Sequence, residues 1–434
     1  MPQLKKFIVV AALLTTAIFL SNCGTSNMRA GSGSTTSGSG SGSGGSGSGS
    51  GSGAGTAGAA NAVPGFGEGT GASGQNSAAK FLYANPLPGG GPFAQSIGSN
   101  GLLTGQQDGS ANNIDPMTMA IDPTGSFLFQ TAEGFNNGTQ SGLFVYAINR
   151  SNGSLGPAVQ SYLVGQPVFS DVVDNQGKFL FVLATNGVYA YSIQSGTGAL
   201  TAVAGSPFAT PTPSSPGNSL PATLMAIDQT NKFLYVSTSG GIVAFAIDPN
   251  TGQLTPAPGS PFGTNVAGPW TLVITPNNSF LYVLQVKSSA SIYGFSIDQN
   301  SGALTPLAGS PFNAGSCGTV VAAGTIGVPG PDNMTIASAG KFMYDNCGVY
   351  SIDQSSGAIT VVSQQGPGDW PVIDPTGNFL WAITGDQQAC FHCDIGVTTY
   401  QVDANTGGFT AVSNGFFLLT NSEVGYVNGL AITK

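Results

Sequence analysis

The sequence predicts an all-β fold, a seven-bladed β-propeller built from four-stranded antiparallel blades. The first observation behind this prediction is a short aromatic phrase, Phe-Leu-Tyr or a variant, that returns seven times at intervals of 37 to 62 residues. Self-similarity at such a period is typical of stacked or radial repeats, and each copy here reads as strands and turns. The copies begin at Phe81, Phe127, Phe179, Phe233, Phe280, Phe342 and Phe379.

The second observation concerns the two ends of the repeat region. Six residues before the aromatic, six copies carry Ile or Val, whereas the first copy carries Gln75. An apolar segment that fits this place is found at the end of the chain, where residues 429–433 resemble residues 119–122. We therefore predict that the C-terminal strand pairs with residues 81–83 and closes the ring, which removes the open sheet edge of a linear array.

The third observation is that the repeat strands are apolar on both faces. A sheet with one wet face alternates apolar and polar residues, but residues 233–236 do not. Blades that pack between two neighbours explain this pattern, whereas a β-sandwich, the rival fold, offers no reason for seven repeats. In the clearest copy, strands are expected at 224–227, 232–236, 241–247 and from Leu254, with turns at 228–231 and 248–252.

The turns carry residues chosen for their backbone angles. Asp-Pro-Thr-Gly at 122–125 and 374–377 places Pro where φ is near −65° and Gly where φ can be positive. Gly-Ser-Pro-Phe segments at 205–208, 259–262 and 309–312 are interpreted as exits from outer strands, with the Phe between blades. A turn glycine with an apolar residue two places later recurs in all seven copies, at Gly101, Gly153, Gly198, Gly252, Gly302, Gly357 and Gly407.

Composition and the N-terminus indicate an exported protein. Only 7% of the 434 residues are charged and the net charge is −9, which argues against nucleic acid as a partner. An apolar run at 7–20 is followed closely by Cys23, which resembles the lipidated cysteine of a bacterial lipoprotein; a soluble secreted protein is the alternative. The predicted domains are a signal peptide at 1–23, a disordered Gly/Ser-rich tether at 24–77 and the propeller at 78–434.

The remaining cysteines allow three kinds of chemistry. Cys390 and Cys393 flank His392 in a Cys-x-x-Cys pattern, which could be a redox pair or, with Cys317 and Cys347, a zinc site. In an exported protein, two disulfides are the simpler interpretation. We expect Cys390 to pair with Cys393 and Cys317 with Cys347, and we expect neither a metal nor a cofactor.

Ligand-binding residues are expected where the first strand of each blade begins, because those loops converge on the axial channel. Trp270 and Trp370 could form an aromatic platform for a sugar or peptide, or could fill gaps between blades. Asp115, Asp332 and Asp369 could also supply oxygen ligands to calcium. The full set of candidate mouth residues is Asp115, Gln166, Trp270, Asp332, Asn333, Asp369, Trp370 and Asn428.

The repeat motifs also resemble a known family. Lys232-Phe233-Leu234-Tyr235, the Asp-Pro-Asn-Thr-Gly turn at 248–252 and the Gly-Ser-Pro-Phe exits are similar to those of the lactonase-type seven-bladed propellers, which include 6-phosphogluconolactonase and related cycloisomerases. The resemblance covers roughly residues 78–434. It implies the propeller fold, and it implies lactone chemistry only weakly, because these motifs are turn and core residues.

Two functions from different classes are expected. The first is a binding module for a protein, peptide or glycan, monomeric and anchored in the cell envelope, in the outer membrane, through Cys23. The single histidine and the few cations favour it, because a phosphorylated lactone needs cationic groups and ring opening needs an acid, a base or an oxyanion donor. The alternative is a lactonase-type hydrolase or a cycloisomerase, as the family resemblance implies.

Overall fold

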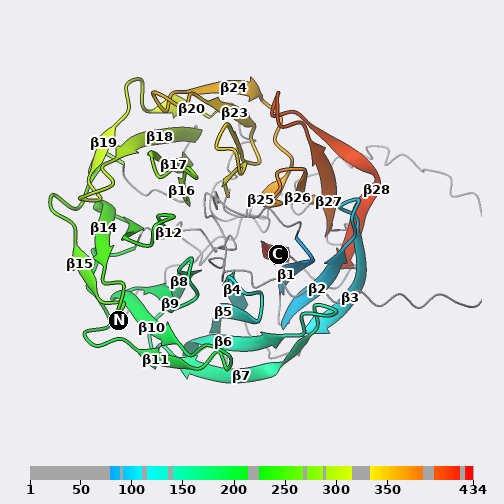
Figure 1. The fold of residues 1–434 in the computed structure, drawn as a ribbon, viewed down its shortest axis with the longest axis horizontal. Coiled ribbons are helices and arrows are strands. Elements are labelled where there is room, and N and C mark those ends of the chain that lie inside the picture. The colour runs from blue at the N-terminus through cyan, green and yellow to red at the C-terminus, as the bar shows by residue number, and fades with distance from the viewer. Residues whose placement is uncertain are drawn as a thin grey trace, which may run out of the picture. The chain divides into compact units, whose positions relative to one another are not determined.

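The computed structural model (Figure 1) confirms the predicted propeller. It describes residues 79–87, 91–109, 115–134, 140–213, 224–266, 271–286, 290–314, 333–384, 395–420 and 426–433, all within one unit, Gly58–Lys434. Seven antiparallel sheets are arranged around a common axis in these ranges, and their regular elements are all strands. No helix in the described ranges has the length and apolar character needed to cross a membrane.

Each blade has four strands that follow one another from the axis to the rim, and the first blade takes its innermost strand from the C-terminus. Blade 1 comprises β29 (Tyr426–Ile432), β1 (Phe81–Leu87), β2 (Gly91–Ile97) and β3 (Leu103–Gly109); blade 2 comprises β4 (Asp115–Ile121), β5 (Phe127–Gly134), β6 (Gln140–Ile148) and β7 (Leu155–Leu163); blade 3 comprises β8 (Val168–Val173), β9 (Phe179–Ala184), β10 (Gly187–Ile193) and β11 (Leu200–Ala202).

Blades 4 to 7 repeat this plan, and blade 5 has a short additional strand, β20 (Phe312–Asn313), which pairs with its third strand. Blade 4 comprises β12 (Met225–Ile227), β13 (Phe233–Thr238), β14 (Gly241–Ile247) and β15 (Leu254–Pro256); blade 5 comprises β16 (Thr271–Ile274), β17 (Phe280–Val286), β18 (Ala290–Ile297) and β19 (Leu304–Pro306); blade 6 comprises β21 (Thr335–Ile336), β22 (Phe342–Tyr344), β23 (Val349–Ile352) and β24 (Ile359–Ser363); blade 7 comprises β25 (Asp369–Ile373), β26 (Phe379–Thr384), β27 (Ile395–Val402) and β28 (Phe409–Thr420).

Strand β29 closes the ring as the sequence predicts. It pairs antiparallel with β1, with Leu82 opposite Ile432. The hydroxyl of Thr433 accepts a hydrogen bond from the amide of Phe81 at 3.1 Å. In blade 4 the carboxylate of Asp228 accepts the corresponding bond from the amide of Phe233 at 2.7 Å, so the last residues of the chain also replace the turn cap that blade 1 lacks.

The structure explains why Phe and Gly recur together in every copy. The Phe that starts the second strand of one blade packs on the turn glycine of the next blade, and a Cβ on that glycine would collide with the ring. Each of these glycines has φ between +69° and +77°, a conformation that other residues adopt at a cost. The contacting pairs are Phe81/Gly153, Phe127/Gly198, Phe179/Gly252, Phe233/Gly302, Phe280/Gly357, Phe342/Gly407 and Phe379/Gly101.

The third residue of the repeat phrase adds a hydrogen bond across several of these junctions. The hydroxyl of Tyr282 donates to the carbonyl of Gly357 at 2.7 Å, and Tyr83 donates to Gly153 at 2.8 Å. Burial raises the pKa of Tyr282, so this hydroxyl stays protonated and remains a donor. Tyr344 occupies the same place in blade 6, but its buried hydroxyl has no hydrogen-bond partner in the structure.

This difference gives a matched pair of substitutions. Tyr282→Phe is expected to lower the free energy of unfolding by about 1 kcal/mol, because the carbonyl of Gly357 loses its buried donor. Tyr344→Phe is expected to leave stability unchanged or raise it, because it removes an unpaired buried hydroxyl. Urea unfolding of both variants checks this, and equal losses would contradict it.

Candidate active site at the bulged inner strands

Among the residues that the structure describes, four innermost strands carry a β-bulge. They belong to blades 7, 1, 2 and 3, where the bulge shifts the register of the described strand. The described parts of the innermost strands of blades 4, 5 and 6 are shorter and pair without a shift. The four bulged blades are consecutive around the ring (Figure 1). Because β-bulges concentrate beside active sites, where they redirect side chains, we place the candidate active site on this side of the ring.

The bulge of β25 contains a residue in a strained backbone conformation. Trp370 has φ of +49°, and the other non-glycine residues with positive φ in the described ranges are all asparagines. Gly368 has φ of +132°, and a Cβ there would lie 2.5 Å from the carbonyl oxygen of Ile383. Asparagine adopts this region of backbone space readily, whereas tryptophan adopts it at a cost, so the surrounding structure must hold the strained conformation.

The bulge sends two neighbouring side chains in different directions. Trp370 is 1% exposed and packs in the hydrophobic core shared with Tyr83 of blade 1 and Trp381 of blade 7. This is the gap-filling role that the sequence left open beside the aromatic platform. Asp369 remains partly exposed at the start of β25, on the face where the first strands begin.

The surroundings of Asp369 suit proton transfer. The amide of Asn346, in the turn after β22, donates to Oδ1 of Asp369 at 3.4 Å across the junction of blades 6 and 7. Partial burial raises the pKa of Asp369, and the hydrogen bond from Asn346 opposes the shift without cancelling it. A solvent-reaching carboxyl with a raised pKa is the type of group that acts as a general base or acid near neutral pH.

A second carboxyl, Asp171 on β8, was not among the residues expected from the sequence. It is 2% exposed, and its Oδ1 accepts a short hydrogen bond from the hydroxyl of Thr118 in blade 2. Its other oxygen, Oδ2, is buried and has no hydrogen-bond partner in the structure. Burial raises the pKa of Asp171 to about 7, against the lowering effect of the hydrogen bonds from Thr118 and Thr131.

A buried amide network lies on the face of blade 2 that packs against blade 1, opposite the face that contacts Asp171. The side-chain amide of Gln130 donates to Asn85 Oδ1 in blade 1 at 2.8 Å, and its carbonyl accepts from the hydroxyl of Tyr146 at 3.1 Å. The amide nitrogen of Asn85 is buried without a partner. The junctions between blades 1 and 2 and between blades 2 and 3 are therefore polar at their inner ends.

The structure describes two of the other predicted mouth residues in full. Gln166 is exposed and accepts a hydrogen bond from Thr185 at 3.1 Å, whereas Asn333 is buried and accepts one from the amide of Met334. Asp115, one of the proposed calcium ligands, lies in β4 and Asn428 lies in β29, but their side chains are not described. Trp270 and Asp332, the latter also a proposed calcium ligand, lie outside the described residues.

The cysteines and the N-terminus lie mostly outside the described ranges. Cys347 is described; it is buried and disulfide-bonded, and its partner falls outside these ranges. The pairings of Cys317 with Cys347 and of Cys390 with Cys393 therefore stay predictions, as do the signal peptide, the tether and lipidation at Cys23. Where residues are described, no three His, Cys, Asp or Glu side chains come together as a metal site would require.

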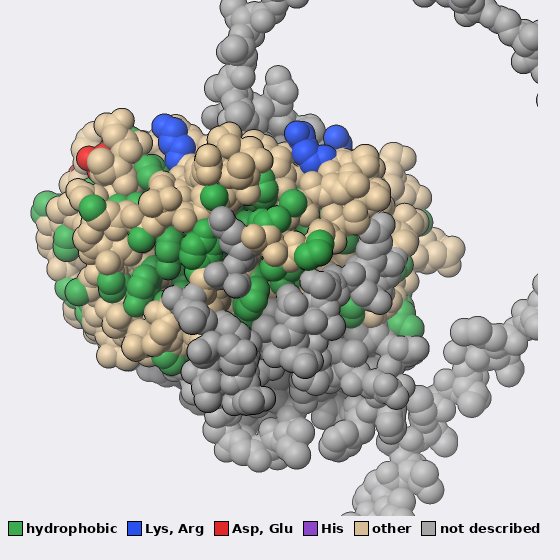
Figure 2. Space-filling view, turned by 90° about the horizontal axis from the view of Figure 1, so that it is seen from below, with side chains coloured by type: hydrophobic (Ala, Val, Ile, Leu, Met, Phe, Trp, Pro, Cys, Tyr) green, Lys and Arg blue, Asp and Glu red, His purple; other side chains and the backbone are tan. Residues whose placement is uncertain are grey.

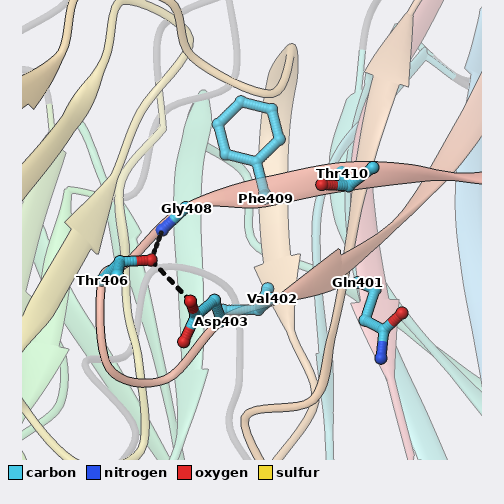
Figure 3. Close-up of a pocket in the computed structure, with 7 residues that line it drawn as sticks. All are labelled: Gln401, Val402, Asp403, Thr406, Gly408, Phe409 and Thr410. Carbon is cyan, nitrogen blue, oxygen red and sulfur yellow. Dashed lines mark hydrogen bonds between the residues drawn. The ribbon is translucent and has the colours of Figure 1, made fainter.

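A shallow pocket of about 480 Å³ lies at the turn between β27 and β28, the two outer strands of blade 7. Figure 3 shows the residues that line it. The hydroxyl of Thr406 donates to the carboxylate of Asp403 at 2.8 Å, and the amide of Asn405 donates to the same carboxylate at 2.9 Å. These bonds lower the pKa of Asp403. Asp248, Asp298 and Asp353 cap the same turn in other blades, so the polar groups of this pocket belong to the repeat scaffold.

The described cations lie away from the candidate site. Lys80, Lys178, Lys232 and Lys341 are exposed and precede the Phe that starts a second strand, and therefore lie on the face opposite the one where first strands begin. Arg150 is exposed in the turn after β6. Figure 2 shows basic side chains along one edge of the side that it views.

Fold and site together define the chain as a seven-bladed β-propeller. The model of the lactonase seven-bladed β-propeller family matches residues 171–322, which run from β8 to beyond β20. The resemblance of the repeat motifs to this family is thereby confirmed. A comparison with curated protein sequences finds no match.

Solved structures with the same fold include proteins linked to lactone chemistry. The periplasmic gluconolactonase of Pseudomonas aeruginosa is 16% identical with a TM-score of 0.56, covering 82% of this chain and 99% of that one. A Bacteroides uniformis protein with a provisional assignment as a 6-phosphogluconolactonase is 15% identical with a TM-score of 0.59, covering 81% and 99%. A Lactobacillus plantarum protein is 16% identical with a TM-score of 0.61, covering 82% and 100%. At these identities the likeness establishes the fold alone.

Proposed function

We propose that the propeller is a lactone hydrolase in which Asp369 is the proton-transfer group. The observation that carries the proposal is the strained bulge at Trp370, which leaves Asp369 partly exposed with a raised pKa. The family match and the names of two structural relatives support lactone chemistry. They favour the hydrolase over the binding module that the scarcity of cations and histidine suggested.

The reaction needs one group that can accept and return a proton. Water attacks the carbonyl carbon of the lactone, the ring C–O bond breaks, and a hydroxy acid forms. Asp369 in its ionised form takes a proton from the attacking water and then returns it to the departing alkoxide. The raised pKa strengthens the carboxylate as a base, and the hydrogen bond from Asn346 holds it in place.

We further propose that the substrate is an uncharged lactone. A phosphate group is held by guanidinium or ammonium groups, usually through several charge-assisted hydrogen bonds. The described lysines lie at turns on the opposite face, and the described arginine is exposed after β6. Export, anchoring through Cys23 and a monomeric state stay predictions beside this proposal.

Steady-state kinetics of the full chain tests the role of Asp369. We expect Asp369→Asn to lower kcat for an uncharged lactone by about 100-fold or more, as loss of a general base usually does. Asp403→Asn is the matched control, because Asp403 is a carboxylate of the rim turn shown in Figure 3, and we expect it to change kcat by less than about threefold. An Asp369→Asn protein that folds and retains its kcat would refute the assignment.

A further inference from the structure

Asp171 breaks the repeat at a buried position. Two residues before the Ile or Val of the repeat, blade 3 has an acid, whereas the other six blades all have an apolar residue. An unpaired carboxylate at a buried site destabilises a fold, because no neighbouring charge compensates for the lost hydration. The residues at this position in blades 1, 2, 4, 5, 6 and 7 are Leu430, Met119, Met225, Leu272, Met334 and Pro371.

The acid connects two blades through hydroxyl groups. The hydroxyl of Thr118 in β4 donates a hydrogen bond to Asp171 Oδ1, and it accepts one from the backbone amide of Asp171 at 3.1 Å. The hydroxyls of Thr118 and Thr131 lie 2.9 Å apart, and the amide of Thr118 donates to Thr131 at 3.1 Å. We call the set Thr118, Thr131 and Asp171 the blade 2–3 clasp. It replaces an apolar side chain at this one position, whereas the junction around it is apolar and includes Phe129 of β5 and Val182 of β9.

The strands around Asp171 offer no cation to neutralise it when it ionises. Among the described elements, β4, β5, β9 and β12 pack against β8. The titratable residues on these four strands are Asp115 of β4 and Glu133 of β5, and both are acids. Ionised Asp171 is thus a buried charge with one oxygen lacking a hydrogen bond and with other acids on the neighbouring blade.

We propose that the clasp is a proton-operated junction: blades 2 and 3 are held together by neutral Asp171, and the junction opens more readily once this carboxyl is ionised. In the closed junction the pKa of Asp171 is about 7, whereas an opened, hydrated carboxyl has a value near 3.8. The closed state is therefore fully favoured below about pH 4. The stability of the closed junction falls as the pH rises from about 4 to about 7, and it is constant above about pH 7.

Amide hydrogen exchange of the full chain, resolved to single residues by fragmentation, tests the clasp. The amides of Asp171 and Thr118 are the reporters, because both donate to clasp hydroxyls. After correction for intrinsic exchange, their opening constant is expected to rise up to about tenfold per pH unit between pH 4 and 7, and to be flat above about pH 7. Amides of β12, at the junction where Met225 takes the place of Asp171, are expected to show no such rise.

Two variants separate titration from packing. Asp171→Asn keeps the shape of the side chain and Asp171→Met restores the repeat, and both are expected to make the reporter amides independent of pH. Asp171→Met is also expected to raise the urea midpoint at pH 8 more than at pH 4. A flat profile in the unmodified chain, or a pH dependence that survives in Asp171→Asn, would overturn the proposal. Because exchange needs no substrate, this result is independent of whether the protein hydrolyses lactones.

Discussion

Leu430→Asp is expected to destabilise the propeller by about 4 kcal/mol or more, because it places a charge in the strand that closes the ring. Leu430 is fully buried and lies opposite Ala84 in the pairing of β29 with β1. The substitution weakens the contact between the two ends of the chain, and opening there exposes the inner edge of blade 1. Equilibrium unfolding in urea measures the loss as a lower midpoint.

Leu418→Asp is the matched control for this experiment. Leu418 lies on the outermost strand of blade 7 and is 40% exposed, so the same change there should alter stability by about 0.5 kcal/mol or less. A midpoint for Leu430→Asp that equals that of Leu418→Asp would mean that β29 contributes nothing to the stability of the ring.

Gly198→Ala is expected to lower the free energy of unfolding by about 3 kcal/mol. Its φ is +69°, and a Cβ would lie 2.6 Å from the ring of Phe127 in the preceding blade. The backbone penalty is about 1 to 2 kcal/mol. Displacement of a packed ring adds about 1 to 3 kcal/mol.

Gly196→Ala in the same turn isolates the backbone part of this effect. Gly196 has φ of +86°, but a Cβ at this position would meet nothing within 4 Å, so only the penalty of about 1 to 2 kcal/mol applies. The difference between the two variants, measured by urea unfolding, reports the contact with Phe127. Equal losses would show that the contact between blades adds nothing.

Local patterns in the sequence were enough to predict the fold. The spacing of the aromatic phrase gives the number of blades, and the apolar segment before Thr433 identifies the strand that blade 1 lacks. Both signals are strong because every blade must bury two faces, which forces the same apolar pattern seven times. The contact of each Phe with the glycine of the next blade was not predicted, although both residues were recognised, because the sequence does not reveal which copies touch.

The candidate site could be predicted only in part. Asp369 was expected at the start of a first strand, but the bulge that buries Trp370 and leaves Asp369 partly exposed depends on backbone angles that no local pattern encodes. Asp171 was missed, although a signal existed. Alignment of the seven copies on their Ile or Val shows an acid in one and apolar residues in six, such as Met119 and Met225.

The most direct test of lactone chemistry is the rate at which the full, unmodified chain opens an uncharged five-membered lactone, followed as proton release in unbuffered solution. We predict a rate above spontaneous opening that rises in proportion to protein concentration and exceeds the rate with a phosphorylated lactone. A folded protein that leaves the spontaneous rate unchanged for every lactone between pH 5 and 9 would contradict this prediction.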